Sequence, residues 1–445
     1  MSSLRLMWIL AAVAVLGAVP LARAKSAAAW VEGQQGHGDD DGDDSGDDDF
    51  EDDDGDDGPD GVDDVDDVDD ELDDEDGDGD NSGSGSDDDG RISGHNGDLR
   101  QLASASDDML DVELDDYGYE VKAGEVLAAA SETFDASEVA AFGLEVVSRD
   151  SLPGLGMNLV TLKVPVGADA NAAYRMLVGR TTAVVARNHY FTAGRTYRSR
   201  SRSVLLRRHE APKGVVGMID GGIGAGAAPG GISLTTASFS SRPSAASAHG
   251  AAVASVLANS GVRKIFSANI FEGRKATTSK LLKALDWMAT NKVPVINISL
   301  AGAPNPIVRK AIAILVARGH IVVAAVGNNG PAAPPLYPAA YPEVVAVTAV
   351  DSKGTIYKRA NHGRHTLFAA PGVGITVGSA NGAVRVLSGT SFAAPVVSAQ
   401  LARLLDHADP DLRRKALGAV IRSARDLGTP GRDPVFGVGL ITPGS

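Results

Sequence analysis

The stretch "VPVINISLAGAPNPIVRKAIAILVARGHIVVAAVG", residues 293–327, decides the fold class of this chain. Two nearly continuous apolar runs, "VPVINISL" and "HIVVAAVG", flank the segment "NPIVRKAIAILVARG", which has helical periodicity. Strands without polar alternation are buried on both faces, and a helix is the usual connection between two parallel strands. The stretch therefore predicts a strand–helix–strand unit of a parallel sheet with helices on both faces.

The same pattern recurs on both sides of this stretch. We predict further strands at "GVVGMI" (214–219), "KIFSANIF" (264–271) and "EVVAVTAV" (343–350), and a further helix at "SKLLKALDWMATN" (279–291). Alternation of buried strands and helices is typical of a single α/β sheet. We therefore expect one α/β domain over residues 213–445.

A second composition precedes this domain. Short alternating runs within residues 119–191 predict strands at "EVLAAA", "LEVVSRD", "NLVTLKVP" and "TAVVARNHYF", with helices at "SEVAAFG" and "NAAYRMLVG". Their order, β-α-β-β-α-β, predicts a small α+β domain within residues 97–192. The basic segment that follows, residues 193–212, has no periodicity and is expected to be an exposed linker.

The acidic residues are concentrated in one tract. Residues 39–89 hold 31 of the 58 Asp and Glu residues and no Lys or Arg, whereas the chain from Leu205 onward carries 26 basic and 11 acidic residues. Like charges at this density repel one another and offer nothing to bury, so residues 25–96 are predicted to be disordered. We hypothesise that this tract keeps the basic domain soluble and its N-terminal neighbour docked, with a simple solvating spacer as the alternative.

Alternate carboxylates at residues 76–81 resemble a calcium loop, because calcium prefers oxygen ligands. Asn81 stands where such a loop has its turn glycine, and no helices flank it, which favours a solvated acidic run. We therefore expect no cofactor; calcium is possible, but no residues can be assigned to it.

The first 24 residues have the pattern of a signal peptide. Arg5 precedes an apolar run at residues 7–19, and Ala22-Arg23-Ala24 is a small-x-small cleavage site. The run is too short to span a bilayer, so we expect export to a periplasm or the exterior rather than a membrane anchor. The chain has no cysteine, which excludes disulfides and a thiol nucleophile.

Four polar residues lie at the ends of predicted elements of the α/β domain. Asp220 and Asn328 follow strands, His249 precedes a helix, and Ser391 begins one. Singly, each has an ordinary explanation as a turn former, a structural histidine or a helix cap. Functional groups collect at the carboxyl ends of parallel strands, and Asp, His, Ser is one of the chain orders of serine-protease triads. The glycine-rich segment after Asp220 contains Pro229 and opens into no helix, which disfavours nucleotide binding.

The domain from residue 213 onward resembles the subtilisin family (subtilases) of serine proteases. "GTSFAAP" (389–395) fits the family's nucleophile motif throughout, and "VINISLAG" (295–302), "VVAAVGNNG" (322–330) and "GVGLI" (437–441) also match. Two positions depart from the pattern: Gly221 stands where Thr or Ser is usual, and Ala251 stands in place of Thr. Neither departure removes a reacting group.

The resemblance implies a subtilisin-like fold and a secreted serine endopeptidase, made as a zymogen, that acts on polypeptides. Ser391 would be the nucleophile, His249 the general base and Asp220 its orienting partner, while the Asn328 carboxamide and the Ser391 N–H would bind the oxyanion. The substrate would lie between two walls of the active site. The enzyme would prefer an apolar residue, or show a broad preference, at the substrate position before the cleaved bond. The wall residues are Ser299, Leu300, Ala301, Ala325, Val326 and Gly327. Nucleic acid is not an expected partner.

The small domain resembles the propeptides that chaperone and inhibit subtilases. Its last strand, "NHYF" (188–191), would approach the active site, and self-cleavage would fall between Thr192 and Lys213. Two alternatives remain open: a catalytically inactive subtilase fold that serves as a binding module, and a calcium-binding surface protein whose main function lies in the acidic tract.

Overall fold

The computed structural model describes residues 112–131, 139, 141–165, 167–194, 197–198, 213–224, 227–240, 247–378 and 384–443. The expected signal peptide, the acidic tract and most of the basic linker lie outside these residues, as do residues 137, 138 and 140 of the expected helix at 137–143.

A seven-stranded parallel sheet forms the centre of the α/β domain, as the sequence predicts. Its order is β15 (Thr366–Pro371), β14 (Val345–Val350), β13 (Ile321–Ala325), β11 (Val295–Ile298), β7 (Val215–Asp220), β9 (Lys264–Asn269) and β8 (Ser233–Ser238). Every neighbouring pair is parallel. From β7, the strands β8 and β9 extend the sheet in one direction, and β11 and the later strands extend it in the other. The direction in which strands are added therefore reverses beside β7. Such a reversal is where open α/β sheets bind ligands.

Helices cover both faces of this sheet, which confirms the predicted class. α3 (Ala248–Asn259), α6 (Thr390–Leu404) and α7 (Pro410–Ser423) share one buried cluster, to which β7 contributes Met218. α4 (Thr278–Thr290) and α5 (Pro306–Ala317) share the other, to which β7 contributes the next residue, Ile219. Successive strand residues point to opposite faces, so one short apolar strand fills both clusters.

An antiparallel sheet precedes the α/β domain, and we call it the N-terminal sheet. Its order is β5 (Val184–Ala193), β2 (Glu120–Ala130), β4 (Met157–Lys163) and β3 (Glu145–Leu152), with β1 (Val112–Leu114) paired to β2. One face, including Val126, packs with α2 (Ala170–Leu177), and the other, including Leu127, joins the cluster of α4 and α5. Burial on both faces fixes the strand register, because a slip by one residue would exchange the two sets of side chains.

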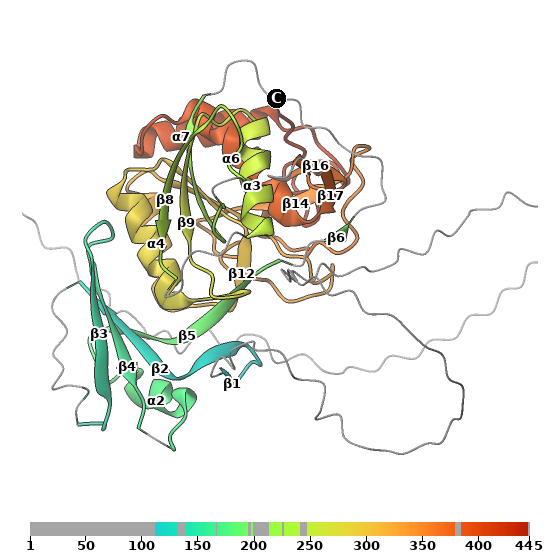
Figure 1. Cartoon of the computed structure of the whole chain (residues 1–445). Coiled ribbons are helices and arrows are strands. Elements are labelled where there is room, and N and C mark those ends of the chain that lie inside the picture. Colours follow the sequence, from blue (N-terminus) through green and yellow to red (C-terminus); the bar gives the residue numbers. More distant parts are fainter. Residues whose placement is uncertain are drawn as a thin grey trace, which may run out of the picture. The chain divides into compact units, whose positions relative to one another are not determined.

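Strand β5 also pairs with the α/β domain (Figure 1). It lies between β10 (Lys275–Thr277) and β12 (Leu300–Gly302), antiparallel to both. Ion pairs support this contact: Lys275 with Glu120 and Lys283 with Asp150, each at 2.8 Å.

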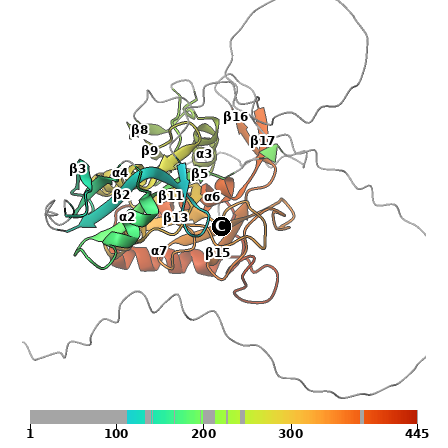
Figure 2. The ribbon, with the colours of Figure 1, turned by 90° about the horizontal axis from the view of Figure 1, so that it is seen from below.

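A small separate sheet lies near the start of α6. β16 (Ile375–Gly378) and β17 (Val384–Ser388) pair antiparallel, and the short strand β6 (Tyr197–Arg198) adds to β17, as Figure 2 shows. Among the described residues, no helix is both long and apolar enough to cross a membrane.

Candidate active site

Asp220 and His249 lie at the point where the strand order reverses. Asp220 ends β7 and is fully buried, and its Oδ1 lies 2.8 Å from Nδ1 of His249 in the first turn of α3. The same oxygen accepts the Gly221 N–H at 2.7 Å. A carboxylate held in this way fixes the orientation of the imidazole and directs its Nε2 away from the carboxylate.

The start of α3 explains the departure at Gly221. Ser247 caps the helix by accepting the Gly250 N–H at 3.1 Å, and a Cβ on Gly221 would stand only 2.3 Å from Cβ of Ser247. A Cβ on Gly250 would stand 2.4 Å from the carbonyl oxygen of Gly221. The chain therefore passes α3 at a distance that only glycines permit, and Ser247 occupies the space that a side chain at position 221 would need.

Ser391 is the second residue of α6 and is 1% exposed. The N-cap is Gly389 and makes no side-chain cap bond, so the interpretation of Ser391 as a helix cap is wrong. The aromatic ring of the next residue, Phe392, lies 6.0 Å from the His249 ring, which brings the start of α6 beside α3.

Pro395 lies in the second turn of α6 and leaves the Ser391 carbonyl without its helical donor, because proline has no N–H to give to residue i−4. The Ser299 hydroxyl supplies the missing bond, donating to the Ser391 carbonyl oxygen at 3.1 Å. Asn297 Nδ2 donates to Ser299 Oγ at 2.9 Å, and Ser398 Oγ donates to Asn297 Oδ1 at 3.0 Å. This fully buried chain of polar groups ties β11 to α6 directly beneath the serine.

Asn328 follows β13 and is tied to α6 through its carbonyl oxygen. Its Oδ1 accepts the Thr390 N–H at 3.0 Å and the Thr390 hydroxyl at 2.8 Å. These two donors identify the oxygen of the amide, so Nδ2 points the other way. Cβ atoms built on Gly389 and Gly194 would stand 3.2 Å and 2.9 Å from that nitrogen.

The residues expected to line the substrate are neighbours in space. Ser299 and Leu300 follow β11, while Ala325 ends the adjacent β13 and Val326 follows it. All four are nearly or fully buried, while Ala301 is half-buried. Gly327 has a φ of 108°, a conformation that favours glycine. The two segments expected as walls thus leave the sheet side by side.

Sequence reasoning missed several residues that support this arrangement: Gly194, Ser247, Asn297, Thr390 and Ser398. Asn297 carried a usable signal, because a lone amide inside the apolar strand "VINI" must be paired when it is buried. Among the described residues, no group of three His, Asp or Glu side chains is arranged to hold a metal ion.

Curated proteins that are similar to this chain include proteases, two of which each match somewhat more than a third of the chain. The minor extracellular protease Epr of Bacillus subtilis is 39% identical over 163 residues, covering 36% of this chain and 25% of Epr. Subtilisin BL of Lederbergia lenta is 32% identical over 173 residues, covering 38% of this chain and 62% of that protein. The chain thus spans less than two thirds of the length of either relative.

A solved structure shows the same fold. Fervidolysin from Fervidobacterium pennivorans, described as a keratinolytic enzyme related to subtilisin, superposes with a TM-score of 0.59 at 19% identity, covering 75% of this chain and 61% of fervidolysin. Residues 236–439 match the model of the subtilase family. The motifs, the parallel sheet and the sequence similarities agree, so residues 236–439 form a domain of the subtilase family.

Proposed function

We propose that this chain is a serine endopeptidase that is exported as a precursor and hydrolyses peptide bonds through Asp220, His249 and Ser391. The observation that carries the proposal is the 2.8 Å contact between Asp220 and His249, at the edge of the sheet where α6 presents Ser391. A serine hydroxyl is a weak nucleophile at neutral pH and needs such a base.

The reaction follows from the roles these groups can take. The Ser391 hydroxyl attacks the peptide carbonyl while His249 Nε2 takes its proton, and the ester that results is released by water. Asp220 holds the imidazole through Nδ1 and stabilises the imidazolium. His249 then gives the proton to the departing amine.

The oxyanion is bound by Asn328 and by the backbone of α6. Because Thr390 engages the carbonyl oxygen of Asn328, the NH₂ group of the amide faces the reacting carbonyl. The Ser391 N–H, in the first turn of α6, is the second donor, and the positive end of the helix favours the developing negative charge.

The N-terminal sheet acts as the inhibitory propeptide in this proposal. β5 lies between β10 and β12, the position that a substrate strand would take, and the Lys275 and Lys283 ion pairs support its docking. Export through residues 1–24 fits the extracellular relative Epr. The same proposal includes the domain limits expected from the sequence. The signal peptide ends at residue 24, the acidic tract at 96, the propeptide at 192 and the basic linker at 212.

Expression of the full chain beside Ser391→Ala tests this function. We expect self-processing and labelling by a fluorophosphonate probe in the wild type and neither in the variant. Ser423→Ala, which removes a hydroxyl in α7, should keep both. Labelling of all three proteins would contradict the assignment of Ser391, and labelling of none would favour a binding module.

A second variant tests the oxyanion donor. Asn328→Ala should lower turnover on the order of 10²- to 10³-fold, the range known for removal of such a donor from subtilisin itself. Substrate binding should change little, because the donor acts on charge that develops only in the transition state. An unchanged turnover number would remove Asn328 from the mechanism.

A further inference from the structure

The backbone of residues 190–193 is held on both sides by strands of the α/β domain. On one side Tyr190, Phe191 and Thr192 pair with β10, and on the other Phe191, Thr192 and Ala193 pair with β12. Both ladders are antiparallel, so this segment is the middle strand of three. Main-chain pairing of this kind binds an extended peptide whatever its sequence, while side chains set the preference.

The next residue, Gly194, lies against the reacting groups. A Cβ on Gly194 would stand 2.9 Å from Asn328 Nδ2 and 3.3 Å from Ser391 Oγ. The chain pairs again at Tyr197 and Arg198, with Ser388 and Leu387 of β17, just before the start of α6. Gly194 therefore lies beside Ser391, between a paired strand that ends at Ala193 and a short paired strand at residues 197–198.

Phe191 is the buried anchor of this segment. Its side chain is 0% exposed and belongs to the cluster formed with α4 and α5. A Cβ on Gly302 would stand 2.7 Å from Cδ1 of the Phe191 ring, so the absence of a side chain at position 302 makes room for the ring. The exposed side chain of Thr192 carries no such constraint.

Resting on the proposed function, we infer that Ser391 cleaves this chain on the carboxyl side of Gly194 and that residues 191–194 define its preferred substrate. That substrate has glycine at the position before the cleaved bond and a large aromatic residue three positions earlier. The broad or apolar preference expected from the sequence is thereby narrowed to glycine, because a side chain at position 194 meets Asn328 and Ser391.

The cleavage step balances without any added reagent except water. The Oγ of Ser391 bonds to the carbonyl carbon of Gly194, the bond from that carbon to the nitrogen of Arg195 breaks, and the amine takes a proton from His249. Water then attacks the ester, returns the proton to Ser391 and leaves a carboxylate on Gly194.

Amino-terminal sequencing and intact mass of the processed enzyme test the bond. We expect the enzyme to begin Arg-Thr-Tyr, from Arg195, and the released fragment to end at Gly194. A first cut at any other bond, including the one before Gly194, would overturn this inference. If Ser391 still reacts with the fluorophosphonate, the proposed function stands and only the inference fails; without labelling, both fail.

A matched pair of glycine variants tests the requirement at position 194. Gly194→Ala should slow processing of the full chain by about tenfold or more, because displacement of the reacting carbonyl by a fraction of an ångström is costly. Gly230→Ala is the control, since a Cβ there meets nothing within 4 Å. Equal processing of the two variants would contradict the requirement for glycine.

Peptides cleaved by the processed enzyme test the preference without altering its fold. The parent peptide is Tyr-Phe-Thr-Ala-Gly-Arg-Thr-Tyr, which copies residues 190–197. Replacing Phe by Ala should lower kcat/KM on the order of 10- to 100-fold, from the loss of an aromatic side chain's burial. Replacing Gly by Val should lower kcat/KM by about the same factor or more, whereas replacing Thr by Ser should change kcat/KM little. Cleavage of the Ala or Val peptide at the parent rate would overturn the preference.

Discussion

Pro395 and Ser299 show how single residues shape the start of α6, the helix that carries the proposed nucleophile. Proline in the second turn of α6 removes one helical hydrogen bond, and the bond it removes is the one to Ser391. The hydroxyl of Ser299, 92 residues earlier in the chain, donates to that carbonyl instead. The side chain of Ser299 therefore supports the start of α6.

Ser299→Ala should destabilise the protein by about 1–3 kcal/mol, because a buried carbonyl loses its donor. In a Pro395→Ala background the cost should be smaller, because alanine restores the helical N–H. The coupling between the two positions is measured by chemical denaturation of four proteins: the parent, Ser299→Ala, Pro395→Ala and the double variant. All four carry Ser391→Ala, which prevents self-digestion. Additive effects would show that the two residues do not share the Ser391 carbonyl.

Gly221 and Ser247 form a second coupled pair. Gly221→Ser introduces the residue type usual in the family at a point where Cβ would stand 2.3 Å from that of Ser247. We expect slower labelling of Ser391 by the fluorophosphonate and a lower melting temperature. Adding Ser247→Gly should recover part of both, since glycine makes room and is tolerated as an N-cap. A double variant that is no better than Gly221→Ser would refute the steric explanation.

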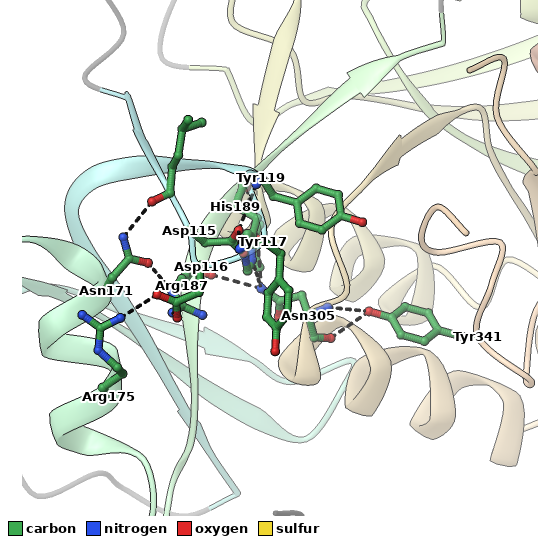
Figure 3. A network of polar contacts seen from close by, with 12 residues as sticks. Asp115, Asp116, Tyr117, Tyr119, Asn171, Arg175, Arg187, His189, Asn305 and Tyr341 are labelled. Carbon is green, nitrogen blue, oxygen red and sulfur yellow. Dashed lines mark hydrogen bonds and ion pairs between the residues drawn. The ribbon is translucent and has the colours of Figure 1, made fainter. Parts of the chain in front are cut away.

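At the scale of elements, β5 and α5 meet through a histidine whose protonation state is determined by its neighbours (Figure 3). The Oδ1 of Asn305 caps α5 by accepting the N–H groups of Ile307 and Val308, so its Nδ2 must face Nδ1 of His189, 3.1 Å away. Nδ1 must then accept, and Nε2 donates to Asp115 at 3.1 Å. A proton on Nδ1 would place two donors, Nδ1 of His189 and Nδ2 of Asn305, opposite each other.

Electrostatics agree with this neutral tautomer. Burial lowers the pKa of His189 below 6.5; Asp115 opposes the shift and Arg187 adds to it. Burial alone would raise the pKa of Asp115, but the N–H groups of Tyr119 and Tyr117, together with His189, hold that pKa below 3.8. The neighbours Asn305 and Thr278 carry no charge.

The full chain should therefore lose stability as the pH falls. A lowered pKa means that the unfolded chain binds a proton more readily, so the contribution of His189 is complete above about pH 6.5 and declines as the pH falls towards its folded pKa. Denaturation of the full chain carrying Ser391→Ala between about pH 5 and pH 8 measures this loss of stability. His189→Gln, which keeps one acceptor and one donor, should flatten the profile; an unchanged profile would exclude His189 as its cause.

At the scale of the whole molecule, charge is divided between the two ends of the chain. The acidic tract lies outside the described residues, while the chain from Leu205 carries 26 basic and 11 acidic residues. Opposite charges raise local encounter rates and are screened by salt. Deletion of residues 36–90 should slow maturation and weaken inhibition at low ionic strength, with a smaller effect at high salt. Identical processing rates at both ionic strengths would favour a simple spacer.

Much of the α/β core was predictable because its signals are local. Apolar runs and helical periodicity identified β7, β9, β11, β13 and β14 with α4 and α5. β8 was missed because its sequence, "SLTTAS", is polar and it lies at the edge of the sheet, where half its residues face solvent. Edge strands carry weaker apolar patterns than central ones, so periodicity alone does not reveal them.

The sequence by itself determined the fold class, the family motifs and the order of Asp220, His249, Asn328 and Ser391, since each depends on neighbouring residues or a short motif. Only the tertiary structure decided that Asp220 meets His249, that Ser299 replaces the bond lost at Pro395, and that Gly194 lies over Ser391. These contacts join residues 29 to 197 positions apart. They depend on sheet order and strand register, which buried packing sets and no local pattern encodes.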